Sequence, residues 1–130
     1  MTNKLSEPIK IVLLVEDDEP IIRAIERRFE EENLSLIISR DGEDGYNKAD
    51  QHRPNLIILD IIMPKMDGLT MLKKIRATTW GKEIPAIVLT NLSSPTQESE
   101  ASKLGVTDYL IKTDWRLDDI TKKIKKILGI

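Results

Sequence analysis

One aspartate interrupts a run of apolar side chains in the segment LIILDIIMPKMDG, residues 56–68. This residue is Asp60, and an ionised carboxylate that is buried alone is costly enough that such groups usually neutralise, pair with a cation or bind a metal. Residues elsewhere in the chain must therefore compensate its charge. Several polar side chains follow other apolar runs and are candidates for this role: Glu16, Asp17, Asp18, Thr90 and Lys112.

Carboxylates that converge on Asp60 would create a site for a hard divalent cation. Two carboxylates about 4 Å apart repel by roughly 4 kcal/mol at an effective dielectric constant near 20. A cluster of Glu16, Asp17 and Asp60 would therefore need a cation or shifted pKa values. The candidate ligands are all oxygens, with no His or Cys nearby, which argues against zinc, copper and nickel. A few carboxylates with positions left for water and phosphate favour Mg²⁺ over a full Ca²⁺ cage.

Phosphoryl transfer is the chemistry that such a site would support. With the metal present, the Asp60 carboxylate can attack phosphorus as a nucleophile and form a labile acyl phosphate. Lys112 would supply an ammonium that offsets charge on the transferring phosphoryl group, and the Thr90 hydroxyl would reach one phosphoryl oxygen. The lone charge in the apolar run is thereby explained by a reaction.

Five apolar runs are predicted to be the strands that position these groups. They are residues 9–15, 34–39, 55–62, 85–90 and 106–111. The runs at 11–15 and 56–59 are continuously apolar rather than alternating, which is typical of parallel strands covered by helices on both faces.

Amphipathic helices are predicted between and after these strands. They are expected over residues 19–33, 41–52, 67–78, 94–105 and 114–128. Asp18 and Asp67 are the predicted N-caps of the first and third helices, and Gly105 is expected to end the fourth. The fourth helix has only Ala101 and Leu104 as clear apolar anchors, so we expect it to open easily.

Five successive strand-helix units predict an α/β fold, a doubly wound five-stranded parallel sheet of order 2-1-3-4-5 with helices on both faces. Ligands of such sheets bind beyond the carboxyl ends of the strands at the switch point, which here lies between the first and third strands. Those two strands are neighbours in this order. We therefore expect Glu16, Asp17 and Asp60 to meet there.

Length and composition limit the remaining possibilities. The 130 residues fit one domain, predicted over 9–130 with an N-terminal tail at 1–8. A net charge of −2 gives no electrostatic reason to expect nucleic acid or an anionic membrane as a partner. There is no cysteine, no signal-peptide core and no apolar run of about 18 to 20 residues. We expect a cytoplasmic protein that binds neither nucleic acid directly nor membranes.

Together these motifs resemble the response-regulator receiver domain, the CheY-like module of two-component signalling. The resemblance covers about residues 9–128, through the acidic pair in LLVEDD, the acceptor in LDIIMPKMDG, the hydroxyl in VLTN, and the aromatic and lysine in DYLIK. It implies a flavodoxin-like phosphoacceptor domain that takes a phosphoryl group from a sensor histidine kinase or a histidine phosphotransfer protein in a Mg²⁺-dependent reaction. Such a domain is a switch that catalyses its own phosphorylation and dephosphorylation, rather than an enzyme.

The resemblance also implies how each residue of the acidic site acts. Asp60 would be the phosphoacceptor and, with Asp17 and the backbone carbonyl of Ile62, a direct Mg²⁺ ligand. Glu16 would act on the metal through water.

Three further residues are implied to carry the response to phosphorylation. Lys112 would pair with the phosphoryl group. Thr90 and Tyr109 would form a switch pair, in which the hydroxyl moves toward the phosphoryl group and the ring turns inward behind it. This would alter the face of the fourth helix, fifth strand and fifth helix for a downstream protein that the sequence does not name.

The sequence departs from the family's usual pattern at four positions. Thr113 follows the lysine where proline is common, and a cis bond before a non-proline residue costs about 2.5 to 4 kcal/mol, so we expect a trans bond there. Asn91 is larger than the usual residue after the hydroxyl. Ile62 and Leu92 are apolar where some relatives carry polar groups that orient water, and we hypothesise that they slow hydrolysis of the acyl phosphate.

Two other functions compete with a phosphorylation switch. A Mg²⁺-dependent phosphohydrolase with an aspartyl-phosphate intermediate typically has a second aspartate two residues beyond the nucleophile, where this chain has Ile62, and a cap domain. A degenerate receiver used only for docking would not need the acidic set or Lys112. Incubation with a small phosphodonor distinguishes the switch, the phosphohydrolase and the docking module.

Overall fold

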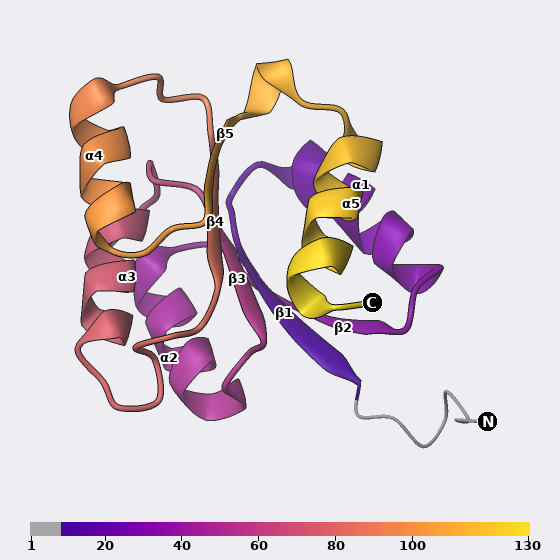
Figure 1. Cartoon of the computed structure of the whole chain (residues 1–130), viewed down its shortest axis with the longest axis horizontal. Coiled ribbons are helices and arrows are strands. Elements are labelled where there is room, and N and C mark those ends of the chain that lie inside the picture. Colours follow the sequence, from indigo (N-terminus) through magenta and orange to yellow (C-terminus); the bar gives the residue numbers. More distant parts are fainter. Residues whose placement is uncertain (1–8) are drawn as a thin grey trace.

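Five parallel strands form one sheet in the order β2-β1-β3-β4-β5 in the computed structural model, which describes residues 9–130 (Figure 1). The strands are β1 (Lys10–Val15), β2 (Leu34–Ser39), β3 (Leu56–Leu59), β4 (Ala86–Thr90) and β5 (Asp108–Ile111). The strand order and the parallel direction confirm the prediction. The predicted tail at 1–8 lies outside the described residues.

Five α-helices cover the two faces of this sheet. They are α1 (Glu19–Glu30), α2 (Gly42–His52), α3 (Gly68–Arg76), α4 (Pro95–Lys103) and α5 (Leu117–Leu128). Figure 1 shows α2, α3 and α4 on one side of the sheet and α1 and α5 on the other. Within residues 9–130, no helix combines the length and the apolar character needed to cross a membrane.

The central strands are buried on both faces because their side chains alternate between two apolar clusters. Val12 and Leu14 of β1 pack with residues of α1 and α5, whereas Leu13 and Val15 pack with residues of α2, α3 and α4. All four residues of β3 are fully buried. This double burial explains the continuous apolar runs. It also fixes the register of the strands, so the residues that directly follow them lie at the same edge of the sheet.

The turn from β3 into α3 brings the start of a helix against Asp60. Asp67 caps α3 as predicted, since its carboxylate accepts hydrogen bonds from Thr70 N at 2.9 Å and Thr70 Oγ1 at 2.6 Å. Gly68 comes next, and a Cβ atom there would lie only 1.9 Å from the main-chain oxygen of Asp60. A residue with a side chain would force the helix away from the strand. Gly68 thus helps to position the loop that carries Asp60.

Two predicted helix boundaries are wrong by three residues: the first helix, predicted over 19–33, ends at Glu30, and the start of the last helix is misplaced. The sequence predicts a helix over 114–128, but α5 begins at Leu117. Lys112–Asp114 form a 3-10 turn instead, and Trp115 and Arg116 are extended, with ψ angles of 139° and 152°. Extended residues cannot continue a helix, so the turn and α5 are separate elements.

The α4 helix is held less firmly than the other helices. Ala101 is the only residue that it buries, whereas each other α-helix buries at least three. Its carboxyl end is fixed from α3, because Arg76 donates from Nε to the Leu104 oxygen at 2.8 Å. The same guanidinium donates from Nη1 to the Gly81 oxygen, in the connection between α3 and β4, at 2.8 Å. The amino end of α4 has no comparable clamp among the hydrogen bonds of residues 9–130.

Amide hydrogen exchange is therefore expected to be at least about tenfold faster in α4 than in β3, because thin burial lowers the free energy of local opening. Exchange should be fastest near the amino end of α4, which lies farthest from Arg76. Peptide-resolved deuterium uptake measures both. Equal protection of α4 and β3 would show that the helix is anchored by interactions other than those described above.

Candidate functional site

Three carboxylates from the ends of two neighbouring strands meet at one edge of the sheet. Glu16 and Asp17 follow β1, Asp60 follows β3, and one oxygen of each lies within 4.8 Å of the others. Glu16 is 1% exposed and Asp60 is 7% exposed, whereas Asp17 faces solvent. The predicted convergence of the acidic residues is therefore confirmed.

Lys112 compensates the buried charge of Asp60. Its ammonium donates to Asp60 Oδ2 at 2.8 Å and lies 2.7 Å from Glu16 Oε1. The lysine side chain is itself only 9% exposed. Residues 9–130 contain no cis peptide bond, so the bond to Thr113 is trans, as expected. A trans bond is therefore compatible with a lysine that reaches the centre of the site.

Burial and charge shift the pKa of two groups in this cluster. The pKa of Glu16 is raised to about 7, first by burial and also by the charge of Asp60, although its hydrogen bond with Lys112 acts in the opposite direction. Burial alone would lower the pKa of Lys112, but its hydrogen bonds to Asp60 and Glu16 outweigh burial and raise it. Lys112 therefore stays charged, while Glu16 can bind a proton near neutral pH.

Asp18 lies at the border of this cluster, and its side chain does not cap a helix. It occupies the N-cap position of α1, as predicted, but its side chain makes no cap hydrogen bond. The Asp18 Oδ2 atom lies 3.9 Å from Lys112 Nζ. The capping role predicted for this side chain is wrong, because its carboxylate accepts no hydrogen bond from the first turn of α1.

The two residues of the predicted switch pair are joined through one main-chain segment. The Thr90 Oγ1 atom accepts a hydrogen bond from Leu92 N at 3.2 Å, and the Tyr109 hydroxyl donates to the Leu92 oxygen at 2.6 Å. Thr90 is fully buried, while Tyr109 is half-buried. Burial and the charges of Glu98 and Asp60 raise the pKa of Tyr109. Leu92 was singled out from the sequence for its side chain alone, because main-chain bonding partners leave no trace in residue type.

Ile62 lies beside Asp60 with its side chain 61% exposed. Its N–H donates to Asp60 Oδ1 at 3.3 Å, so each oxygen of the Asp60 carboxylate has its own donor. The metal-binding role of the Ile62 carbonyl stays a prediction.

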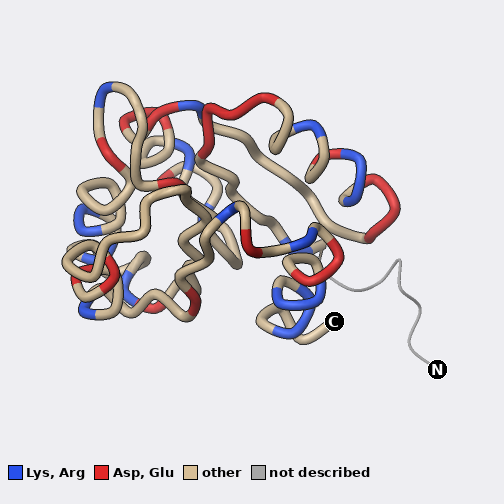
Figure 2. The backbone as a smooth tube through the Cα atoms, turned by 90° about the horizontal axis from the view of Figure 1, so that it is seen from above, with Lys and Arg blue, Asp and Glu red and all other residues tan. Residues whose placement is uncertain are grey.

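The donor set at this edge fits a hard divalent cation. Three carboxylates face one ammonium, so the cluster of Glu16, Asp17, Asp60 and Lys112 carries two uncompensated negative charges when all four are ionised. The available ligand atoms are oxygens, which suit Mg²⁺ or Mn²⁺. Figure 2 looks onto the molecule from above and shows acidic and basic segments interspersed along the chain, so the acidic excess is local.

Comparison with known proteins identifies the family. The family model of the response regulator receiver domain matches residues 12–125. The chain therefore belongs to the receiver-domain family and is a signalling switch of the kind found in two-component response regulators.

Individual relatives agree with this assignment. Response regulator ArlR of Staphylococcus aureus (strain Mu50 / ATCC 700699) is 32% identical over 117 residues, which cover 90% of this chain and 52% of ArlR. The chain thus spans about half the length of that relative. A CheY-like receiver domain protein from Methanospirillum hungatei JF-1 has a TM-score of 0.86 and 25% identity, over 94% of this chain and 95% of that one. The Mn²⁺-bound form of response regulator Rcp1 has a TM-score of 0.78 and 33% identity, over 91% of each chain.

Magnesium affinity is expected to fall about tenfold when the pH is lowered from 8 to 6. Glu16 has a raised pKa of about 7, so it is ionised at the upper pH and mostly protonated at the lower one. Protonation removes one of the charges that attract the cation, while Lys112 keeps its own charge throughout. Calorimetric titration of the chain with Mg²⁺ measures the change, and Glu16→Gln should flatten it. Equal affinity at both pH values in the unaltered chain would contradict the role of Glu16.

Proposed function

We propose that Asp60 accepts a phosphoryl group in a Mg²⁺-dependent reaction, from the phosphohistidine of a sensor histidine kinase or a histidine phosphotransfer protein. The observation that carries this proposal is the position of Lys112, whose ammonium is held 2.8 Å from a buried carboxylate inside an acidic cluster. A nucleophile, a fixed cation and an oxygen donor set are the parts that phosphoryl transfer requires. The family assignment and the Mn²⁺-bound relative support the same reaction.

The residues of the site divide the work of this reaction. An oxygen of Asp60 attacks phosphorus while the bond from phosphorus to the donor imidazole breaks, and the imidazole leaves with the electron pair and takes up a proton. Lys112 moves from the Asp60 carboxylate to a phosphoryl oxygen, so its charge stays compensated. Asp17, Asp60 and the Ile62 carbonyl would hold Mg²⁺ directly, with Glu16 acting through water. The bound ion supplies positive charge that stabilises the phosphoryl oxygens in the transition state.

Phosphorylation would then be sensed through Thr90. A phosphoryl oxygen on Asp60 would accept a hydrogen bond from the Thr90 hydroxyl, and movement of the side chain toward this charged acceptor would draw Oγ1 away from Leu92 N. Loss of the contact to Leu92 N frees the segment whose oxygen holds the Tyr109 hydroxyl. The ring can then turn inward, which changes the face of α4, β5 and α5 for a downstream protein partner.

Incubation with acetyl phosphate and Mg²⁺, followed by intact-mass measurement, tests this function. A gain of one phosphoryl group per chain, persisting through the measurement, supports a phosphoacceptor. Rapid consumption of acetyl phosphate with no retained group would indicate a phosphohydrolase. A chain that neither gains mass nor consumes the donor would be a docking module without phosphoacceptor activity.

Polar replacements beside Asp60 are expected to accelerate loss of the phosphoryl group. Ile62 and Leu92 flank the site with apolar side chains, so they offer no group to orient water. In the double variant Ile62→Asn with Leu92→Gln, we expect hydrolysis of the acyl phosphate to be about tenfold faster. Intact-mass measurements at intervals after removal of the donor give the rate. Ile9 is similarly exposed, at 57% against 61% for Ile62, and Ile9→Asn is the matched control. A half-life of seconds in the unaltered chain, unchanged by the double variant, would rule the hypothesis out.

A further inference from the structure

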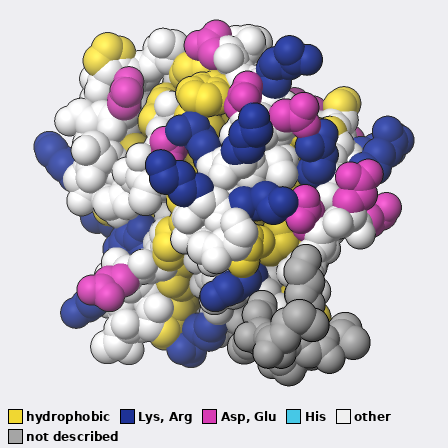
Figure 3. All heavy atoms as spheres, turned by 45° about the vertical axis from the view of Figure 1, so that its right-hand side comes forward, with side chains coloured by type: hydrophobic (Ala, Val, Ile, Leu, Met, Phe, Trp, Pro, Cys, Tyr) yellow, Lys and Arg dark blue, Asp and Glu magenta, His cyan; other side chains and the backbone are white. Residues whose placement is uncertain are grey.

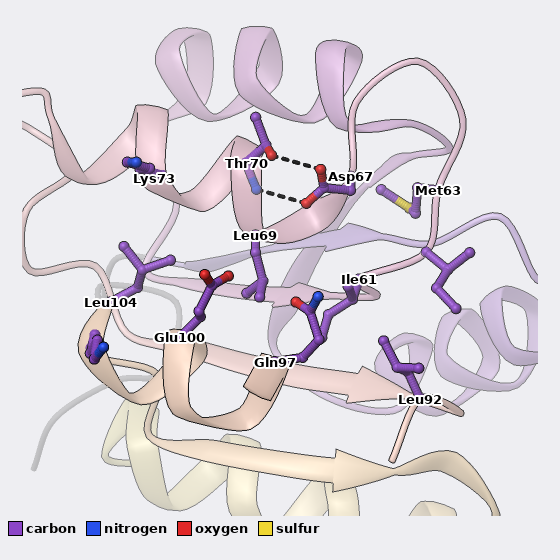
Figure 4. A pocket seen from close by; sticks show the side chains of 12 residues that line it. Ile61, Met63, Asp67, Leu69, Thr70, Lys73, Leu92, Gln97, Glu100 and Leu104 are labelled. Atoms are coloured by element: carbon purple, nitrogen blue, oxygen red, sulfur yellow. Dashed lines mark hydrogen bonds between the residues drawn. The ribbon is translucent and has the colours of Figure 1, made fainter. Parts of the chain in front are cut away.

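A groove of about 690 Å³ runs between α3 and α4 and begins beside the phosphoacceptor loop. Its volume falls within the range of sites that bind ligands or side chains of a partner. Figure 4 shows α3 and α4 facing each other across it, with Met63 and Leu92 toward one end and Lys73 and Leu104 toward the other. Six apolar residues contribute to its lining: Ile61, Ile62, Met63, Leu69, Leu92 and Leu104.

The two ends of the groove differ in charge. Lys73 of α3 and Lys103 of α4 both line the groove, and Figure 4 shows Lys73 and Leu104, the residue after Lys103, at the end away from Met63 and Leu92. Neither lysine forms an ion pair within residues 9–130. Glu100 lies between them and the opposite end, and Asp67 is occupied as the cap of α3. An apolar end therefore continues into an end where two lysines outnumber one carboxylate, that of Glu100, and none of the three forms an ion pair within residues 9–130.

The groove is also connected to the switch pair through Leu92. The side chain of Leu92 lines the groove, while its main chain bonds to Thr90 and Tyr109. Ile61 and Ile62 directly follow Asp60 and line the same groove. A change at the phosphoacceptor would therefore reach groove-lining residues directly, and any such coupling would act equally from an occupant of the groove to the phosphoacceptor.

From this geometry we infer that the α3–α4 groove binds an amphipathic, acidic helical segment of a downstream protein, in a manner coupled to phosphorylation. Apolar side chains of the segment at helical spacing would pack on the six apolar lining residues. Carboxylates of the segment would pair with Lys73 and Lys103. This inference rests on the proposed function, because it assigns a second partner surface to the same switch. The surface differs from the α4, β5 and α5 face, since it lies on the opposite side of α4.

The opposite face of the molecule provides a matched control. Figure 3 shows basic and acidic side chains mixed on the side turned forward there. In α5, Lys123 pairs with Asp108 at 3.1 Å and Lys125 pairs with Glu32 at 3.0 Å, whereas Lys122 is exposed and lies outside the groove. A neutral replacement of Lys122 removes one exposed charge and leaves the groove unchanged.

Binding of a synthetic peptide tests the inference. The probe is an amphipathic helix of about 14 residues with leucines at i, i+3, i+4 and i+7 and two glutamates in its first turn. Its affinity for the full chain is measured by fluorescence anisotropy, with Mg²⁺ alone and with Mg²⁺ and beryllium fluoride, a stable phosphoryl mimic. A second peptide with lysines in place of the glutamates tests the requirement for negative charge. Methyl NMR shifts of Leu92 and Leu104 locate the binding.

We expect the acidic peptide to shift the Leu92 and Leu104 signals and its affinity to change about fivefold on addition of beryllium fluoride. The double variant Lys73→Gln with Lys103→Gln should weaken binding about fivefold, and Lys122→Gln should not. Equal binding of both peptides, or binding unaffected by Lys73→Gln with Lys103→Gln, would overturn the inference. An affinity that beryllium fluoride leaves unchanged would overturn the coupling. Phosphoryl uptake by intact mass is measured on the same preparations without beryllium fluoride, so failure of the groove is distinguishable from failure of the phosphoacceptor.

Discussion

Replacing Asp60 with asparagine is expected to lower phosphoryl incorporation from acetyl phosphate by at least about 10³-fold, because the amide removes the nucleophile. The side chain keeps nearly the same size, so packing beside Gly68 is preserved. Intact mass after incubation with Mg²⁺ measures incorporation, and a thermal melt checks that the variant is folded. Asp41→Asn is the matched control, since it makes the same chemical change at the N-cap of α2, where asparagine also caps well.

The control separates the role of Asp60 from a general effect of charge. If Asp41→Asn retains full incorporation while Asp60→Asn loses it, the acceptor lies at residue 60. If the folded Asp60→Asn variant still gains a phosphoryl group at an unchanged rate, another residue is the acceptor.

Replacing Lys112 with methionine is expected to damage both the reaction and the stability of the chain. The ammonium is hydrogen-bonded or ion-paired to two carboxylates that are almost completely buried. Removing one partner of such a buried pair typically lowers the free energy of unfolding by about 3 kcal/mol, because it leaves the charge of the other partner uncompensated. We also expect phosphoryl uptake to fall about a hundredfold, since a preorganised cation is lost from the transferring group.

The stability loss should depend on pH and on Mg²⁺. The pKa of Glu16 is already raised to about 7, and without Lys112 it loses the interaction that lowers it. A carboxyl group with a raised folded-state pKa destabilises the fold as pH rises from its unfolded pKa of 4.5 through the folded value. The variant should therefore lose less stability at pH 6 than at pH 8, and Mg²⁺ should restore part of the loss.

Urea denaturation at both pH values, with and without Mg²⁺, measures these changes. Lys123→Met is the matched control, because it breaks a partly exposed pair with Asp108, for which a loss below about 1 kcal/mol is expected. If Lys112→Met lowers the free energy of unfolding no more than the control does, and equally at both pH values, the stability of the buried cluster does not depend on the Lys112 ammonium.

The sheet and the acidic cluster were predictable because their signals are local. Each strand is a short apolar run, and the polar residue that follows it lands at the carboxyl edge whatever the helices do in detail. Asp60 and Lys112 are 52 residues apart in the sequence, yet strand order alone brings their ends to the same edge. The predicted roles, nucleophile for Asp60 and compensating cation for Lys112, depend on this shared position at the carboxyl edge.

The features that sequence reasoning missed depend on main-chain geometry or on competition between partners. The bonds of Leu92 to Thr90 and Tyr109 are made by main-chain atoms, which every residue type has. Asp18 has a plausible local partner in the helix N-terminus, yet its side chain makes no cap hydrogen bond and lies 3.9 Å from Lys112, a residue distant in the sequence. The predicted start of α5 is misplaced because Trp115 and Arg116 have ordinary helix propensities, whereas Arg116 is the extended N-cap residue of the helix and is of a type that does not signal a cap.

The position of the acyl phosphate is the most direct test of the central claim. Borohydride reduces an aspartyl phosphate to homoserine, so reduction of the phosphorylated chain, digestion and tandem mass spectrometry identify the acceptor. We expect homoserine at residue 60 alone, and only when both Mg²⁺ and a phosphodonor are present. Homoserine at Asp17, Asp18 or another acidic residue, or a retained phosphoryl group on a side chain other than a carboxylate, would contradict it.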